Sequence, residues 1–150
     1  GDSVYLLANG QYDVVWRCPY YVQSIAVESR TARTIANATH AVAYDGTLYL
    51  CYSATDWTTY ETTNTFFTYD VATATLSNQS FLKGDTVEIA TNSVYMMEVN
   101  PKNGELYIGL AGNKFVSSGI IHRFEKDGTP IHRFDVQGPN PNQAAFVNYQ

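Results

Sequence analysis

Five aromatic side chains lie in polar stretches between strand-like runs, and their chemistry is that of ligand stacking. Exposed aromatic rings on loops stack on sugar rings or on the apolar side chains of a protein partner. The spacing therefore predicts a binding surface for a glycan or a protein. The alternative is that the rings pack over neighbouring strands, as half-buried Tyr and Trp commonly do. The five candidate ligand-binding residues are Tyr12, Trp16, Trp57, Tyr60 and Phe115.

Carboxylates offer a second chemistry, the hydrolysis of glycosides or lactones. Glycosidases need two carboxyl groups about 5–9.5 Å apart. The innermost predicted strands supply one acid, Glu98, whereas Asp13, Asp56 and Glu61 lie in predicted loops. No motif fixes the geometry of these groups, so the sequence names no catalytic residue.

Histidines and cysteines show no metal-ligand spacing. His122 and His132 flank a predicted turn, where antiparallel pairing would bring them within reach, but two imidazoles lack a third ligand for zinc. His40 stands alone. Cys18 and Cys51 form either a disulfide, in an exported protein, or two unrelated thiols. We expect no metal and no cofactor.

Composition excludes several classes of protein. The 150-residue chain is 45% hydrophobic and 15% charged, with a net charge of −5. Such a chain can bury a core as a single domain and is unlike a disordered one. Its negative charge offers no basic patch for nucleic acid. It has no apolar run near the ~18 residues that a membrane-spanning helix needs. Residues 1–5 show no signal-peptide pattern.

Short runs rich in β-forming residues alternate with turn signals. The chain holds 12 Tyr residues, which favour strands, and much Thr. Asp45-Gly46, residues 100–104 and Asp127-Gly128 each separate two such runs and supply residues that tolerate positive φ. No window shows helical spacing of apolar residues. The sequence therefore predicts an all-β fold built as an antiparallel meander.

An apolar-Tyr-apolar core recurs three times, at Val4–Leu7, Leu48–Cys51 and Leu106–Gly109. Each copy precedes a polar insertion, a second β-rich run and a further extended piece. Four strands in ~40–50 residues are typical of a β-propeller blade. We predict a single propeller segment, residues 1–150, of about three four-stranded blades. The predicted blades are residues 1–39 with a strand at 143–149, residues 40–93, and residues 94–142.

Two segments resemble the YVTN-type, surface-layer-like β-propeller repeats of exported bacterial proteins. Residues 99–108 are similar to the pattern V-x-P-x-x-G-x-(I/L)-Y-(V/I), and residues 117–128 to S-S-G-x-(I/V)-x-x-(F/Y)-x-x-D-G. The resemblance covers residues 94–148 well, 40–82 loosely and 1–36 weakly. It implies a propeller and export, to the periplasm or the cell surface. It implies no reaction, since many members of the family have no assigned activity.

The predicted strands are too few to form a closed propeller ring. The first predicted unit lacks its inner strand, and a last inner strand, Ala144–Asn148, ends the chain. Three blades are too few for a ring, because propellers have ~4–8. Either N-terminal blades precede this segment in a longer chain, or two copies form a six-bladed homodimer. In the homodimer, Ala144–Asn148 would pair with the partner's first unit.

Three functions fit these observations. The first is a non-catalytic binding or scaffolding module that recognises a glycan or a protein through the aromatic loops. The alternative is a propeller enzyme of the lactonase or glycoside-hydrolase type, with substrate at the central channel. Such an enzyme should carry several inward-facing carboxylates or histidines, and the predicted inner strands carry Glu98. The third is a purely structural segment of a larger propeller.

Overall fold

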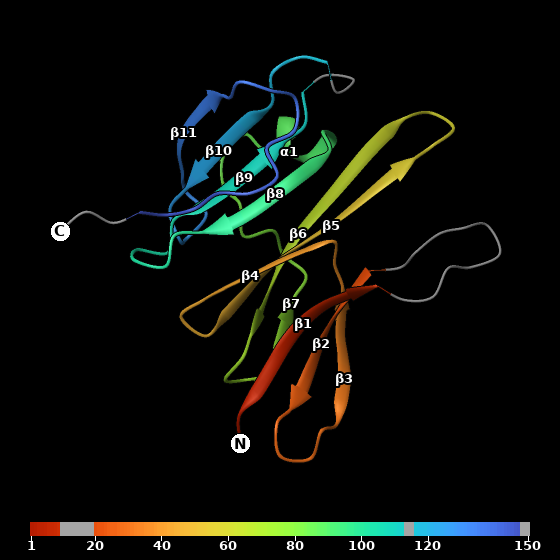
Figure 1. Ribbon diagram of the computed structural model, residues 1–150, viewed down its shortest axis with the longest axis vertical. Helices are drawn as coiled ribbons and strands as arrows, with labels where there is room; N and C mark the ends of the chain where they lie inside the picture. The colour runs from red at the N-terminus through yellow and green to blue at the C-terminus, as the bar shows by residue number, and fades with distance from the viewer. Residues whose placement is uncertain (10–19, 113–115, 148–150) are drawn as a thin grey trace.

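The computed structural model describes residues 1–9, 20–112 and 116–147. These residues form three antiparallel sheets that follow one another along the chain and along the long axis of the molecule (Figure 1). The first sheet contains β1 (Ser3–Asn9), β2 (Tyr20–Ala26) and β3 (Ala32–Asn37). The second contains β4 (His40–Tyr44), β5 (Thr47–Asp56), β6 (Glu61–Asp70) and β7 (Thr75–Ser77). The third contains β8 (Val94–Val99), β9 (Leu106–Leu110), β10 (Ile120–Phe124) and β11 (Pro130–Asp135).

Every sheet is a meander in which strands adjacent in sequence pair side by side. The predicted all-β fold and its antiparallel meanders are therefore confirmed for the described residues. One short helix, α1 (Val87–Thr91), was not predicted, and it lies in the long connection between β7 and β8. Among the described residues, no helix is long and apolar enough to cross a membrane.

Over its described residues, 144–147, the predicted last strand Ala144–Asn148 is not a strand. Residues 144–147 belong to no sheet, and Asn148 lies outside the described residues. The first sheet has three strands and each of the others has four. A β-strand needs a neighbour for its backbone hydrogen bonds. Residues 144–147 have a strand-like sequence, but no neighbouring strand pairs with them.

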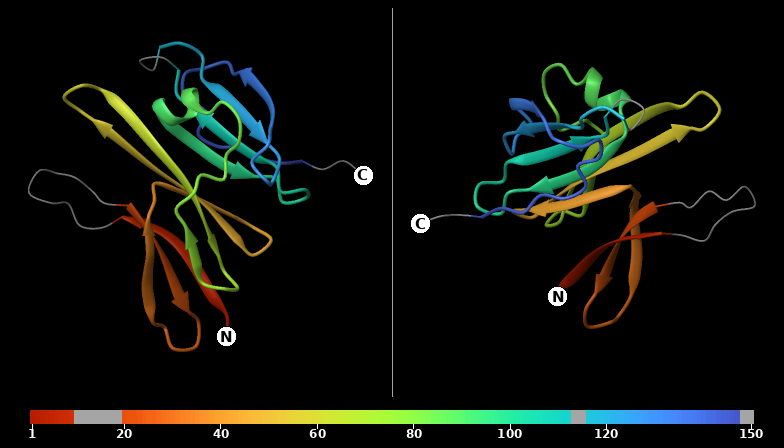
Figure 2. Two further views of the ribbon diagram at one scale, coloured as in Figure 1. Left: turned by 180° about the vertical axis from the view of Figure 1, so that it is seen from behind. Right: turned by 45° about the horizontal axis from the view of Figure 1, so that its top comes forward.

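The apolar-Tyr-apolar repeat explains how the sheets stack face to face (Figure 2). Successive side chains of a strand point to opposite faces of its sheet. Tyr5 of β1 therefore packs towards the second sheet, where it joins a core that includes Leu48 and Leu50 of β5. Tyr49 of β5 points the other way, into the core shared with the third sheet.

We call the face that carries the repeat tyrosine the forward face of a sheet, and the opposite face its backward face. The forward face of the first sheet covers the backward face of the second, and the forward face of the second covers the backward face of the third. The third sheet completes the series, with Tyr107 on its forward face and Leu106 and Ile108 on its backward face. Burial of these faces is the main stabilising contribution to the fold.

Cys51 lies in the core between the second and third sheets and is a free thiol. Its side chain is fully buried, and burial raises the pKa of the thiol to about 12. A buried thiol with a raised pKa stays protonated and unreactive at neutral pH. Cys51 is therefore a core residue in this structure, and Cys18 lies outside the described residues.

Candidate functional site

The β5–β6 hairpin projects beyond the body of the second sheet (Figure 1). The sequence predicts that Asp56 and Glu61 lie in a loop, but the two strands stay paired as far as these two residues. Four residues, 57–60, remain as the turn. Thr residues, which favour strands, occupy five of the twelve positions from 53 to 64 and support the extended pairing.

Hydrogen bonds within the turn fix its conformation. One carboxylate oxygen of Asp56 accepts hydrogen bonds from the backbone N–H groups of Thr58 (2.7 Å) and Thr59 (3.3 Å). The N–H of Tyr60 donates to the carbonyl of Asp56 at 2.7 Å, with Tyr60 at φ +60°. The backbone donors, Thr58 foremost, lower the pKa of the Asp56 carboxyl. Asp56 therefore holds the turn in shape.

Trp57 and Tyr60, two of the five predicted ligand-binding residues, lie at the tip of this hairpin. Their side chains are 75% and 77% exposed, so neither ring is packed into the core. Exposed rings of this size are available to a ligand. The other three candidates, Tyr12, Trp16 and Phe115, lie outside the described residues.

Both rings border a groove of about 740 Å³ that runs between the hairpin and the third sheet. One wall comes from the hairpin, and the other comes from the end of α1, the two residues before β8 and the residues after β9. The lining combines the two aromatic rings with hydroxyl groups, one side-chain amide and two small residues. The lining residues are Thr55, Trp57, Thr59, Tyr60, Thr62, Thr91, Asn92, Ser93, Ala111 and Gly112.

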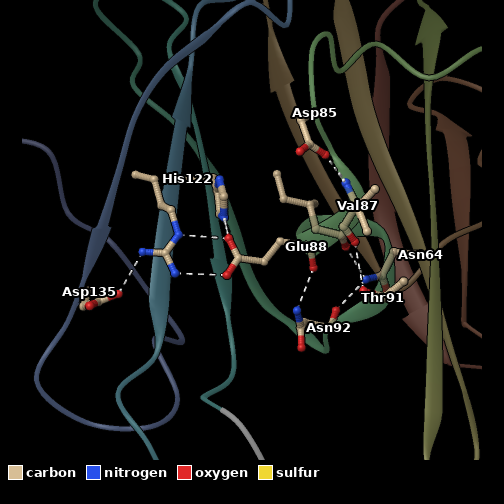
Figure 3. Close-up of polar contacts among 10 residues, drawn as sticks. Asn64, Asp85, Val87, Glu88, Thr91, Asn92, His122 and Asp135 are labelled. Atoms are coloured by element: carbon tan, nitrogen blue, oxygen red, sulfur yellow. Dashed lines mark hydrogen bonds and ion pairs between the residues drawn. The ribbon is translucent and has the colours of Figure 1, made fainter.

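Asn64 of β6 fixes the second wall although it does not line the groove. Its side-chain amide donates to the backbone carbonyls of Ile89 (2.7 Å) and Asn92 (2.6 Å). The side-chain amide of Asn92 in turn donates to the carbonyl of Glu88 at 2.8 Å (Figure 3). The bonds from Asn64 supply partners for the carbonyls of Ile89 and Asn92 at the end of α1, whereas the Glu88 carbonyl also accepts the backbone N–H of Asn92.

Hydroxyl groups connect the two walls at the base of the groove. The hydroxyl of Thr62 lies 3.0 Å from that of Thr55 and 3.4 Å from that of Ser93. The N–H of Ala111 donates to the carbonyl of Ser93 at 2.9 Å. The groove therefore has a framework of hydrogen bonds, with its aromatic rings at the outer rim.

The described lining carries hydroxyl and amide groups and no ionisable acid or base apart from the Tyr60 phenol. Hydroxyl and amide groups both donate and accept hydrogen bonds, which suits the hydroxyl groups of a sugar. Aromatic rings suit the apolar C–H face of a pyranose. The chemistry of the groove therefore matches an uncharged polyhydroxyl ligand better than an ionic one.

Behind the groove, Glu88 of α1 anchors the helix to the outer strands of the third sheet (Figure 3). Its carboxylate accepts two hydrogen bonds from the guanidinium of Arg133, at 2.9 and 3.0 Å. It also contacts the Nε2 atom of His122 at 2.8 Å. The Arg133 hydrogen bond lowers the pKa of Glu88, and burial lowers the pKa of His122 despite the neighbouring carboxylate.

This cluster predicts a loss of stability in mild acid. A group whose pKa is lower in the folded chain than in the unfolded chain favours unfolding as the pH falls. We expect the urea midpoint to fall from pH 7 to 5.5, where His122 contributes, and further below about pH 4.5, where Glu88 contributes. Burial also lowers the pKa of His40, so part of the upper slope belongs to that residue.

The His122 contribution is separated by two variants measured by urea unfolding at pH 7 and pH 5.5. His122→Gln should lose less stability over this interval than the unaltered chain. His132→Gln, on the exposed strand β11, should keep the original pH dependence. An identical pH dependence for His122→Gln and the unaltered chain would contradict the assignment.

The predicted proximity of the two histidines is wrong. His122 pairs with Arg133, and His132 pairs with Arg123, so neighbouring positions place the two imidazoles on opposite faces of the sheet. Among the described residues, no group of three His, Cys, Asp or Glu side chains is arranged to hold a metal ion.

Glu98 lies on β8 opposite Tyr107, and burial raises the pKa of its carboxyl. A second carboxyl, Glu105, approaches the same tyrosine, whose hydroxyl donates to it at 3.1 Å. Both Glu105 oxygens also bind Arg123, at 2.6 and 2.9 Å, and this hydrogen bonding lowers the pKa of Glu105. Because both carboxylate oxygens of Glu105 accept hydrogen bonds from Arg123, we assign this carboxylate a structural role.

No protein-family model and no curated protein matches this chain. The resemblance to YVTN-type repeats therefore stays a prediction.

Sequence reasoning identified one wall of the groove and missed the other. Trp57 and Tyr60 stand out because large aromatic rings are rare between polar residues. Thr91, Asn92 and Ser93 are common residue types in a stretch without periodicity. In the sequence, the one indication of this second wall is Asn64, an amide at a position of β6 where the alternation predicts a core-facing side chain.

Proposed function

We propose that the three sheets are blades of a β-propeller and that the chain is a non-catalytic recognition module that binds a glycan through the aromatic groove. Three successive meanders that stack face to face, each containing the same repeat, support the propeller arrangement. The resemblance to YVTN-type repeats supports an exported bacterial protein, at the periplasm or the cell surface.

The observation that carries the binding proposal is the exposure of Trp57 and Tyr60 at the rim of a hydroxyl-lined groove. Ligand sites combine apolar and aromatic surface with a few placed polar groups. The rings would stack on the sugar face, and the Thr, Ser and Asn groups would bond its hydroxyls. A protein loop is the competing ligand, but the uncharged, hydroxyl-rich lining favours the glycan.

A glycan array with purified protein tests the proposal. We expect binding by the unaltered chain and a loss of affinity of about tenfold or more in Trp57→Ala, the usual scale for a stacking residue at a binding hot spot. Tyr52→Ala is the matched control, because Tyr52 is also partly exposed on β5, at 40%, but does not line the groove.

Two results would overturn the proposal. One is glycan binding that Trp57→Ala leaves unchanged, which would place the site elsewhere. The other is no glycan binding by the unaltered chain, which would favour a protein ligand or a scaffolding role.

A further inference from the structure

The backward face of the first sheet lacks a cover that the other two sheets have. Leu48 and Leu50, in the repeat of the second sheet, are 4% and 0% exposed. Leu106 and Ile108 of the third sheet are both fully buried. The equivalent residues of the first sheet are exposed, Val4 at 48% and Leu6 at 43%.

The first sheet also lacks a strand at the matching edge. In the second and third sheets, the strand that carries the repeat is flanked by an inner strand, β4 beside β5 and β8 beside β9. Among the described residues, β1 has β2 as its sheet neighbour and nothing on the other side. A single partner would supply both missing parts. Its forward face would cover the exposed backward face of the first sheet, and its inner strand would pair with the free edge of β1.

The third sheet and the residues after it offer both a forward face and a candidate inner strand. The segment after β11 runs across the forward face of the third sheet (Figure 1), where Phe146 packs on Tyr107 with ring centroids 5.1 Å apart. Ala144 and Phe146 are half-buried, whereas Ala145 and Val147 are exposed, which is the alternation of a strand. Between this segment and the sheet lies a groove of about 630 Å³ lined largely by apolar residues.

We propose that two copies of this chain join head to tail, each placing residues 144–147 against the free edge of β1 in the other. The forward face of the third sheet in one copy then covers Val4 and Leu6 of its partner, as the second sheet covers Leu106 and Ile108 within one chain. A two-fold axis repeats the contact, so both exposed faces are covered at once.

The inference rests on the propeller arrangement and is independent of glycan binding. Six sheets fall within the ~4–8 blades of known propellers, whereas three do not. Pairing at β1 also removes an exposed strand edge, which otherwise promotes aggregation. The two symmetric contacts of the dimer repeat the stacking inside one chain, because each joins the forward face of one sheet to the backward face of the next.

Light scattering of the 150-residue chain at micromolar concentration tests the proposal. We expect twice the mass of one chain for the unaltered protein and the single-chain mass for Leu6→Lys and Val147→Lys. Both substitutions place a charge on surface that is already exposed, so folding should persist, as circular dichroism will show. Val87→Lys is the matched control, because Val87 on α1 is 69% exposed and Val147 is 72% exposed. It should remain dimeric.

Mixing the two monomeric variants gives the sharper result. A pair of one Leu6→Lys and one Val147→Lys chain contains one doubly altered contact and one unaltered contact. The mixture should therefore regain part of the dimer that neither variant forms alone. A single-chain mass for the unaltered protein, open-ended polymers, or a dimer that survives both substitutions would overturn the proposal. Glycan binding by a monomeric chain would leave the proposed function standing.

Discussion

Replacing Gly128 with alanine should lower the free energy of unfolding by about 2–4 kcal/mol, the scale of overpacking combined with an unfavourable φ. A Cβ atom at this position would lie 1.7 Å from the carbonyl oxygen of Phe81, and Gly128 has φ +84°. The close approach allows a hydrogen bond between the two segments, in which the N–H of Lys83 donates to the carbonyl of Gly128 at 2.9 Å. The β10–β11 turn thereby fixes the connection that leads to α1.

Gly46→Ala is the control for the Gly128 substitution. Gly46 also follows an aspartate in a tight turn and has φ +74°, but a Cβ atom there would meet nothing within 4 Å. Its loss should be about 1 kcal/mol, from the backbone conformation alone. Urea unfolding followed by fluorescence measures both variants. Equal losses would show that the contact with Phe81 contributes nothing.

The comparison of these two turns shows what the sequence can and cannot predict. Asp45-Gly46 and Asp127-Gly128 are equivalent as local signals, and both form the predicted turns. The two glycines differ in their packing, because Gly128 alone of the two lies against Phe81, which is 47 positions from it in the chain. Local propensity carries no information about that approach, so the sequence predicts the turn but not its tertiary role.

The repeat was predictable because it depends on alternation. The apolar-Tyr-apolar pattern places Leu48 and Leu50 on one face and Tyr49 on the other, as any strand must. The connection from residue 78 to 93 follows no period, and its helix spans only residues 87–91. A helix this short is stabilised by tertiary contacts such as those of Glu88, so propensity does not reveal it.

The proposed pairing has a consequence for the proposed binding. Rotation about the axis of a propeller keeps each groove on the same face of the ring, so the closed pair would present two aromatic grooves on one face, on opposite sides of the axis. Two linked sites bind a repetitive ligand more tightly than one, because the second contact is intramolecular. A polysaccharide, whose sugar units repeat, would gain from this arrangement. The monomeric variant Leu6→Lys should then bind a long glycan less tightly while binding a single sugar unit unchanged.

Asn64→Ala should lower the free energy of unfolding by about 2–4 kcal/mol, because it leaves two carbonyls without their hydrogen bonds at the buried end of α1. Ile89, whose carbonyl accepts one of these bonds, is fully buried. Glycan affinity should also fall, because the bonds from Asn64 hold the second wall of the groove in place.

The control for Asn64 is Thr65→Ala, at the next, exposed position of β6, which should change stability by no more than about 0.5 kcal/mol. Stability is measured by urea unfolding and affinity by titration with the array's best ligand. If Asn64→Ala loses stability but keeps its affinity, the second wall does not contact the ligand, and the hairpin rings alone account for binding. If it loses neither, other contacts hold the end of α1, and the amide of Asn64 is not what shapes the groove.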